Sequence, residues 1–291
     1  MAKPGIILGG DLNIVKPNTE IDASFLALTI SNGRQQKELS KKAQGKSVVH
    51  LHNSDLKEVN LVFPQKEEQT EIGHFFRQLD ATITLHQDAI QHQQDLKKAM
   101  LQKLFSVNGA RIPTVRFATF KEEWEQRKLG ELIISEIKGK AKANMSGTNA
   151  VYLDANYLNG GKTYYVDAPV DVEADDVLIL WDGSQAGTVY HGFVGCLGST
   201  LKAFKPKESG SFLYQILVKN QQIIYNSYRT PNIPHVIKTF TSEFEIRIPL
   251  IEEQQKIGDF FKNLDDTIAL HQQALDKLKL LKQSLLQKMF V

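Results

Sequence analysis

Two stretches of this chain, each of roughly forty residues, repeat one another without a gap. Residues 63–105 align with residues 248–290 at a constant offset of 185 residues, and about half of the aligned positions are identical. This offset is far longer than the period of roughly 20–50 residues that is typical of stacked repeat proteins. The chain is therefore expected to contain a duplicated building block with a different segment inserted between its two copies.

Each copy is predicted to be one long helix. Apolar residues recur at alternating spacings of four and three residues, which is the pattern of a coiled-coil seam. Each copy follows a proline and begins with a pair of glutamates, which favour the positive end of the helix dipole. Two such helices in one chain most simply pack on each other antiparallel, although a coil that joins identical chains is an alternative. The predicted seam residues are Ile72, Phe76, Leu79, Ile83, Ile257, Phe261, Leu264, Ile268 and Leu275.

A histidine interrupts both seams at the same register, since the repeat aligns His86 with His271. Polar residues on a coiled-coil seam commonly set register and partner choice at a cost in stability. We therefore interpret these two histidines as residues that set the register, rather than as metal ligands or catalysts.

Bulk composition leaves the partner open but favours a soluble, cytoplasmic protein. A net charge of +2 neither demands nor excludes nucleic acid, because local basic patches decide such binding. The single cysteine, Cys196, lies in an apolar run and is predicted to be a small buried residue in a reducing compartment. We expect no membrane partner, because the sequence has neither a run of ~18 apolar residues nor a signal-peptide core.

The segment between the two copies, residues 109–248, is predicted to form a complete α+β domain. Its length is that of an ordinary domain, and glycines separate its short apolar runs. We expect a helix over residues 212–226 with Ser211 as its N-cap, and a short helix over residues 124–132. The expected strands cover residues 164–166, 177–181, 188–190, 193–194 and 244–248.

Residues 1–63 match only the second half of that domain. Lys16-Pro17 and Ser24-Phe25-Leu26 mirror Lys205-Pro206 and Ser211-Phe212-Leu213, and His50 aligns with His235. Nothing in the chain corresponds to residues 113–194. A half domain is expected to expose strand edges, which can pair with a strand of a neighbouring chain. The predicted order is a partial domain (1–63), a long helix (64–108), a complete domain (109–248) and a second long helix (249–291).

These features together resemble the DNA-specificity subunit of Type I restriction–modification systems. The strongest match is the helix opening Ile248-Pro249-Leu250 with Glu252-Glu253-Gln254-Gln255-Lys256-Ile257 and Leu264-Asp265, which the first copy largely repeats. Trp124-Glu125 and Lys128-Leu129-Gly130-Glu131 resemble the opening of a target-recognition domain in this family. Asp176-Val177-Leu178-Ile179, followed by Gly183 and Gly187, resembles its central strand and loop. The resemblance covers essentially the whole chain.

The resemblance implies a non-catalytic reader of double-stranded DNA. In the family, each target-recognition domain reads half of a split site, and the helix pair sets the distance between the halves. The helices dock methyltransferase (modification) subunits, and a motor–nuclease (restriction) subunit can join. This chain departs from the pattern because the front half of its first recognition domain is missing. A homodimer formed through the truncated half would restore a symmetric reader.

Three polar segments of residues 109–248 are candidates for DNA contact. Lysines of a basic loop after the first expected helix suit phosphates, and amides can pair with adenine edges. Arg229 can read guanine or hold a phosphate. The alternatives are a solvated lysine loop, a plain turn and a surface salt bridge, respectively. The candidate residues are Lys138, Lys140, Lys142, Asn144, Trp181, Ser184, Gln185, Arg229 and Asn232.

Enzyme motifs are weak or missing in the sequence. It has no methyltransferase Asn/Asp-Pro-Pro-aromatic motif and no phosphate-binding Walker loop. Glu136-Ile137-Lys138 lacks the upstream Pro-Asp of a nuclease, and His50 and His52 lack a third zinc ligand. We therefore expect no enzyme activity, no cofactor and no metal. The alternatives to a DNA reader are a scaffold or inhibitor that sequesters methyltransferase subunits and a structural coiled-coil protein.

Overall fold

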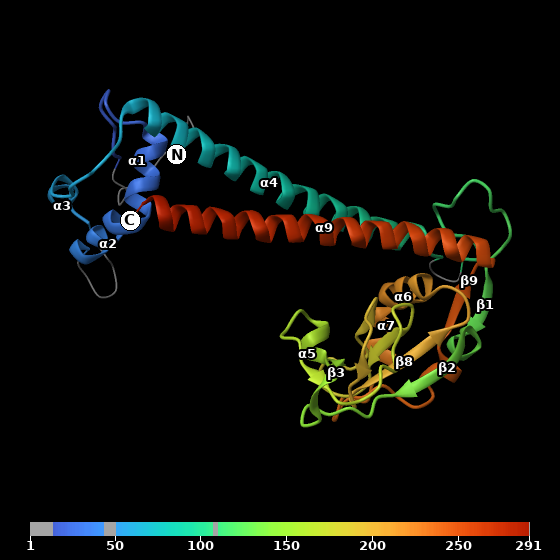
Figure 1. Ribbon diagram of the computed structural model, residues 1–291. Coiled ribbons are helices and arrows are strands. Elements are labelled where there is room, and N and C mark those ends of the chain that lie inside the picture. The colour runs from blue at the N-terminus through green and yellow to red at the C-terminus, as the bar shows by residue number, and fades with distance from the viewer. Residues whose placement is uncertain (1–13, 44–50, 107–109, 291) are drawn as a thin grey trace. The chain divides into compact units, whose positions relative to one another are not determined.

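The computed structural model describes residues 14–43, 51–106 and 110–290. The chain divides into two compact units (Figure 1). Unit 1 consists of Met1–His92 and Ile268–Val291, and unit 2 consists of Gln93–Thr267. Both long helices contribute to both units, so each unit contains a segment of each helix.

The two long helices are α4, Lys66–Lys103, and α9, Ile251–Met289. In unit 1, the ring of Phe76 lies 6.2 Å from that of Phe290. In unit 2, Phe105 stacks on Phe261 at 5.9 Å. In each unit a residue in the first half of one helix thus meets a residue just past the end of the other, so the pairing is antiparallel. The predicted antiparallel coiled coil and the α+β class are confirmed, and all nine seam residues belong to, or pack against, the hydrophobic core of their own unit.

The two copies also use the same ion pair. In unit 2, Lys97 Nζ lies 2.6 Å from Asp265 Oδ1. In unit 1, Lys282 pairs with Asp80. The offset of 185 carries each residue of one pair onto a residue of the other, so the contact is duplicated along with the helix.

Each long helix is fixed near its start by the same two devices. A glutamine amide donates to the carbonyl of the preceding proline, with Gln69 Nε2 2.9 Å from Pro64 O and Gln254 Nε2 2.9 Å from Pro249 O. A glycine then allows a short helix to approach closely. A Cβ on Gly258 would lie 2.8 Å from the hydroxyl of Ser209.

The short helices that approach these glycines correspond to each other. In unit 1, α1 (Ala23–Ser31) is capped by Asp22, whose carboxylate also comes within 2.8 Å of a Cβ placed on Gly73. In unit 2, α6 (Gly210–Lys219) is capped by Ser209. The mirrored segments seen in the sequence therefore form the same contact, a short helix seated on a long one.

The described residues ahead of α4 form helices rather than strands. Besides α1 they contain α2, Gly33–Lys42, and α3, Asn53–Lys57. The strand edges expected for the half domain are therefore not found in the described part of residues 1–63. His50, which aligns with His235 and is part of the weak zinc motif, lies outside the described residues.

Unit 2 contains the α+β domain, which is built on three small sheets. The largest is antiparallel with the order β2-β8-β5-β6, and α6 packs on β5 and β6 to close the core. Its strands are β2 (Ile133–Lys138), β5 (Val177–Leu180), β6 (Val189–His191) and β8 (Leu201–Pro206). The second sheet pairs β1 (Glu125–Lys128) with β9 (Glu245–Ile248). The third sheet has the order β4 (Tyr165–Val166), β3 (Ser146–Leu153) and β7 (Cys196–Leu197). The remaining elements are a 3₁₀ turn, η1 (Leu129–Leu132), and the helices α5 (Ala155–Leu158), α7 (Gln221–Ser227) and α8 (Phe240–Glu243).

Three local predictions for this domain were wrong. The helix expected over residues 124–132 is β1 followed by η1, because pairing with β9 supplies the backbone hydrogen bonds. The helix expected over residues 212–226 starts earlier, capped by Ser209 rather than Ser211, and breaks at Asn220, whose side chain donates to Ile216 O at 2.7 Å. Residues 193–194 are not a strand; the next strand is β7, in which Cys196 is buried as predicted.

Candidate nucleic-acid interface

The loop after β5 presents two polar side chains to solvent. Ser184 and Gln185 are exposed, whereas the neighbouring Ala186 is fully buried and anchors the loop. Gly183 and Gly187 have φ values of 110° and 95°, a backbone conformation that favours glycine. The loop therefore has a defined shape, and its exposed tip carries an amide that can pair with a base edge.

A second loop, residues 229–235, is held against the first. Gly183 N donates to Pro234 O at 2.9 Å, and Asp182 forms a β-bridge with His235. The hydroxyl of Thr230 accepts from His235 N at 3.1 Å and donates to Ile233 O, which closes the second loop on itself. The tip between these contacts is exposed and includes Asn232.

Arg229 connects the two loops. Its Nη1 donates to Ser184 O at 3.1 Å, and its guanidinium carbon lies 5.1 Å from the centre of the Tyr225 ring. The sequence suggested a surface salt bridge as the alternative role, but no ion pair of Arg229 occurs among the described residues. Its remaining N–H groups are therefore available to a ligand, on a side chain whose orientation is already fixed.

The basic loop after β2 is adjacent but is less free than the sequence suggested. Lys138 pairs with Asp182, so its charge is neutralised within the domain. Ala141, in the middle of the loop, is buried and forms a parallel bridge with Gly198. The loop is thus anchored at its centre, while the exposed side chains of Lys140, Lys142 and Asn144 project from it.

Trp181 does not belong to this surface. It is 6% exposed and packs 6.4 Å from the ring of Phe204 in the core. The ammonium of Lys202 lies 3.8 Å from the centre of its ring. We correct the prediction accordingly: Trp181 directly follows the buried strand β5 and supports the loop, but its ring is covered and cannot stack on a base.

The structure thus brings together Lys138, Ser184, Gln185, Arg229 and Asn232, with the other basic-loop residues attached through residues 198–200. Sequence reasoning missed the supporting residues Tyr225, Thr230 and His235. The only signal for them was the pair of prolines that flanks Asn232 and Ile233, which is typical of a rigid turn.

A separate cavity of about 790 Å³ in unit 2 is negatively charged, in contrast to the basic loop. Of the described side chains, five carboxylates and one lysine line it, so it disfavours DNA. His191 lies in this cavity, stacked on Tyr214 at 5.5 Å, and burial lowers its pKa. Burial also raises the pKa of Tyr214 to about 12, so both rings stay neutral near pH 7.

None of the described helices is long and apolar enough to cross a membrane. The described side chains likewise include no cluster of three or more histidine, cysteine, aspartate or glutamate residues arranged to hold a metal ion.

An α+β domain with two braced polar loops and a duplicated, paired helix define a modular binding protein. The family model of the Type I restriction modification DNA specificity domain matches residues 5–93 and 121–280. The chain therefore belongs to this family, and the match includes the larger part of each copy of the repeat.

Individual relatives agree with this assignment. The chain is 28% identical to the Type I restriction enzyme MjaVIII specificity subunit of Methanocaldococcus jannaschii over 63% of its own length but only 44% of that protein's. It is 24% identical to the putative type I specificity subunit S.MgeORF438P of Mycoplasma genitalium, over 96% of this chain and 73% of that one. The crystal structure of a Type I restriction–modification S subunit from M. genitalium has the same fold, with a TM-score of 0.72, 21% identity and coverage of 94% and 73% of the two chains.

Proposed function

We propose that this chain is the sequence-specific DNA-recognition subunit of a Type I restriction–modification complex. In this role it directs methyltransferase and motor–nuclease subunits to a target site in the cytoplasm, and contributes no catalytic residue of its own. The observation that carries the proposal is the match of the DNA specificity family to both copies of the duplicated unit. The chain spans less than half of the MjaVIII subunit, so the activity and partners of a whole complex belong to the proposal.

Within unit 2, the proposed division of labour follows from side-chain chemistry. Gln185 and Asn232 are exposed amides on braced loops, and such amides can bond an adenine edge through two hydrogen bonds. Arg229 is held by Ser184 and Tyr225 and suits guanine. Exposed lysines of the basic loop, Lys140 and Lys142, suit phosphates, which position a protein without reading sequence.

The helices are the proposed docking surface for the methyltransferase subunits. Under this proposal residues 64–108 and 249–291 are the spacer helices, residues 109–248 are a complete recognition domain, and residues 1–63 belong to a partial one. A homodimer formed through the partial domain would supply a second intact reader. A palindromic methylated sequence would favour that dimer, whereas a split sequence with unlike halves would favour reading by one chain.

Methylome sequencing tests the proposal directly. Cells that express this chain with its methyltransferase subunit are compared with cells that express the methyltransferase alone. We expect methylation at one defined sequence, only when the chain is present. The variants Gln185→Ala and Asn232→Ala are expected to lose or broaden that sequence. Gln222→Ala is the matched control, because Gln222 is an exposed glutamine whose side chain bonds its helical neighbour Asn226 and lies outside the two loops.

The outcomes separate the candidate functions. Co-purification with the methyltransferase but no methylation at any site would overturn the DNA-reading role and favour a scaffold or inhibitor. If methylation were unchanged in both loop variants, the proposed function would stand, but Gln185 and Asn232 would not be the residues that read the bases.

A further inference from the structure

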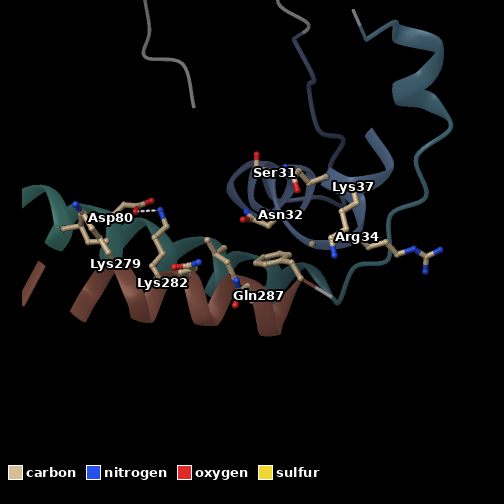
Figure 2. Close-up of a pocket in the computed structure, with 14 residues that line it drawn as sticks. Ser31, Asn32, Arg34, Lys37, Asp80, Lys279, Lys282 and Gln287 are labelled. Carbon is tan, nitrogen blue, oxygen red and sulfur yellow. Dashed lines mark hydrogen bonds and ion pairs between the residues drawn. The ribbon is translucent and has the colours of Figure 1, made fainter. Parts of the chain in front are cut away.

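Unit 1 contains an open cavity of about 1020 Å³ between the α1–α2 turn and the last turns of α9 (Figure 2). Among the described residues, four cationic side chains and a single carboxylate line it, so this part of its wall carries a net positive charge. Polar uncharged groups, among them Ser31, Asn32 and Gln287, add hydrogen-bond donors. The charged lining residues are Arg34, Lys37, Asp80, Lys279 and Lys282.

Two of these cations have no acidic partner within the described part of the chain. Figure 2 shows Lys282 paired with Asp80, and Arg34 lies 2.9 Å from Glu38. Lys37 and Lys279 are exposed and form no such ion pair among the described residues. Lys279 is not shared by the two copies of the repeat, because the aligned residue in the first copy is Gln94. Two free positive charges therefore face the same cavity from different helices.

The start of α2 adds partial positive charge to the same wall. Asn32, at its N-cap position, makes no capping hydrogen bond, because its side chain instead donates to Leu28 O at 2.8 Å. The first turn of α2 contains no acidic residue. The first backbone N–H groups of a helix need an acceptor from outside the helix, and an anion is favoured there.

The α1–α2 turn is held in place by the end of α9. Gly33 has a φ of 63°, and a Cβ at this position would lie 1.4 Å from the carbonyl oxygen of Phe290. Phe290 is buried and packs 5.8 Å from the ring of Phe25. The cavity wall is therefore anchored to the hydrophobic core of unit 1.

We propose that this cavity binds phosphate groups of the DNA backbone and anchors the chain to duplex DNA without reading its sequence. The inference rests on the proposed DNA-recognition function, and adds to it a phosphate site outside the recognition domain. Charge complementarity is the argument for the ligand, since free ammonium groups and an uncapped helix start both favour phosphate oxygens. The cavity is open to solvent, and α2 carries a further exposed lysine, Lys41, whereas Lys42 is paired with Glu58. An open, lysine-rich surface suits a polymer better than an enclosed small anion.

The test uses the full chain assembled with its methyltransferase. Affinity for the target duplex and for an unrelated duplex is measured by fluorescence anisotropy over a range of KCl concentrations, for wild type and for Lys37→Ala/Lys279→Ala. We expect the double variant to weaken both duplexes by the same factor, on the order of tenfold at low salt. The slope of log affinity against log salt should become shallower by about 2, roughly one for each phosphate contact. The control is Lys277→Ala/Lys288→Ala, which removes two exposed lysines of the same helix that do not line the cavity and should leave the slope unchanged.

Three outcomes would overturn the inference. One is a salt slope that stays the same in the cavity variant, or that falls equally in the control. The second is loss of affinity for the target duplex alone, which would indicate base reading. The third outcome concerns inorganic phosphate added at constant ionic strength. If phosphate changed the DNA affinity of wild type but not of the cavity variant, and the two otherwise bound DNA equally, the cavity would be a site for a free anion. Failure of the proposed function would give a different result. Wild type would then bind the target and the unrelated duplex equally well, while the cavity variant would still have a shallower salt slope than wild type.

Discussion

His86 and His271, which occupy the same position in the two copies of the repeat, face each other with their Nδ1 atoms 2.9 Å apart. At this distance one Nδ1 must donate and the other accept, so a single hydrogen lies between these two nitrogens. Polar pairs of this kind favour one register in a coiled coil, because sliding the helices leaves a polar atom against an apolar side chain. The duplicated ion pairs Lys97–Asp265 and Lys282–Asp80 support the same register.

Replacing this histidine pair with leucines tests its role. Each single variant, His86→Leu or His271→Leu, should destabilise the chain by about 1 kcal/mol, because the remaining imidazole loses its partner. The double variant should recover that loss, because two apolar side chains can pack together on the seam. Urea unfolding of all four proteins gives the coupling energy. Strictly additive losses would show that the hydrogen bond between the rings is not important.

The buried ion pair near the start of α9 should matter far more than any exposed one. Arg116 donates two hydrogen bonds to Glu253, at 2.8 and 2.7 Å, and Glu253 is only 1% exposed. Glu253→Ala leaves a poorly exposed guanidinium without its partner, which should cost about 3–5 kcal/mol of unfolding free energy. The repeat supplies the control, since Glu68, the counterpart of Glu253, is exposed, and Glu68→Ala should cost less than about 0.5 kcal/mol. Equal effects in urea unfolding would contradict this account.

The helices were predictable because their signal is periodic and occurs twice. The seam residues follow from spacing alone, and packing of the two copies on each other is the simplest arrangement that the repeat predicts. The role of Glu253 was not predictable in this way, because Glu68 lies in the same Glu-Glu-Gln motif but forms no ion pair with an arginine among the described residues. What distinguishes the two glutamates is Arg116, which lies 137 positions away in the chain.

The candidate interface was predictable in composition but not in geometry. Amide and guanidinium groups suit base edges, so the sequence predicts base contacts for Gln185, Arg229 and Asn232, and the loops that carry them meet in the structure. Trp181 was misplaced because the sequence does not show where a buried strand ends and its loop begins. The basic cavity of unit 1 was missed entirely, since it joins residues 31–37 to residues 279–290, and no local pattern links them.

His191 should make the stability of the chain depend on pH. Burial lowers its pKa below the ordinary value of 6.5, against the opposing effect of Asp175, 3.5 Å away. As the pH falls below 6.5, the unfolded chain takes up a proton that the folded chain still refuses, so stability decreases. Above 6.5 the contribution is complete, and below the folded pKa the decrease levels off.

The variant His191→Gln should therefore lose less stability than wild type between pH 7.5 and pH 5.5, when each is compared with itself by urea unfolding. His92→Gln is the control, because His92 is an exposed histidine on α4, and this variant should follow the wild-type dependence. A variant at His191 that still loses as much stability as wild type would assign the effect to another group.

Loss of the two kinds of DNA contact proposed for unit 2 should affect DNA binding in different ways. Arg229→Ala removes a guanidinium that is already held by Ser184 and Tyr225, and should cost roughly 1–3 kcal/mol at one base pair of the target. Lys140→Ala should weaken target and unrelated duplexes alike and reduce the salt slope by about 1. Binding of the assembled complex to a set of single-base target variants, each measured at several salt concentrations, separates the two patterns. If Arg229→Ala weakened every duplex equally, its role would be to hold a phosphate, and base reading would fall to Gln185 and Asn232.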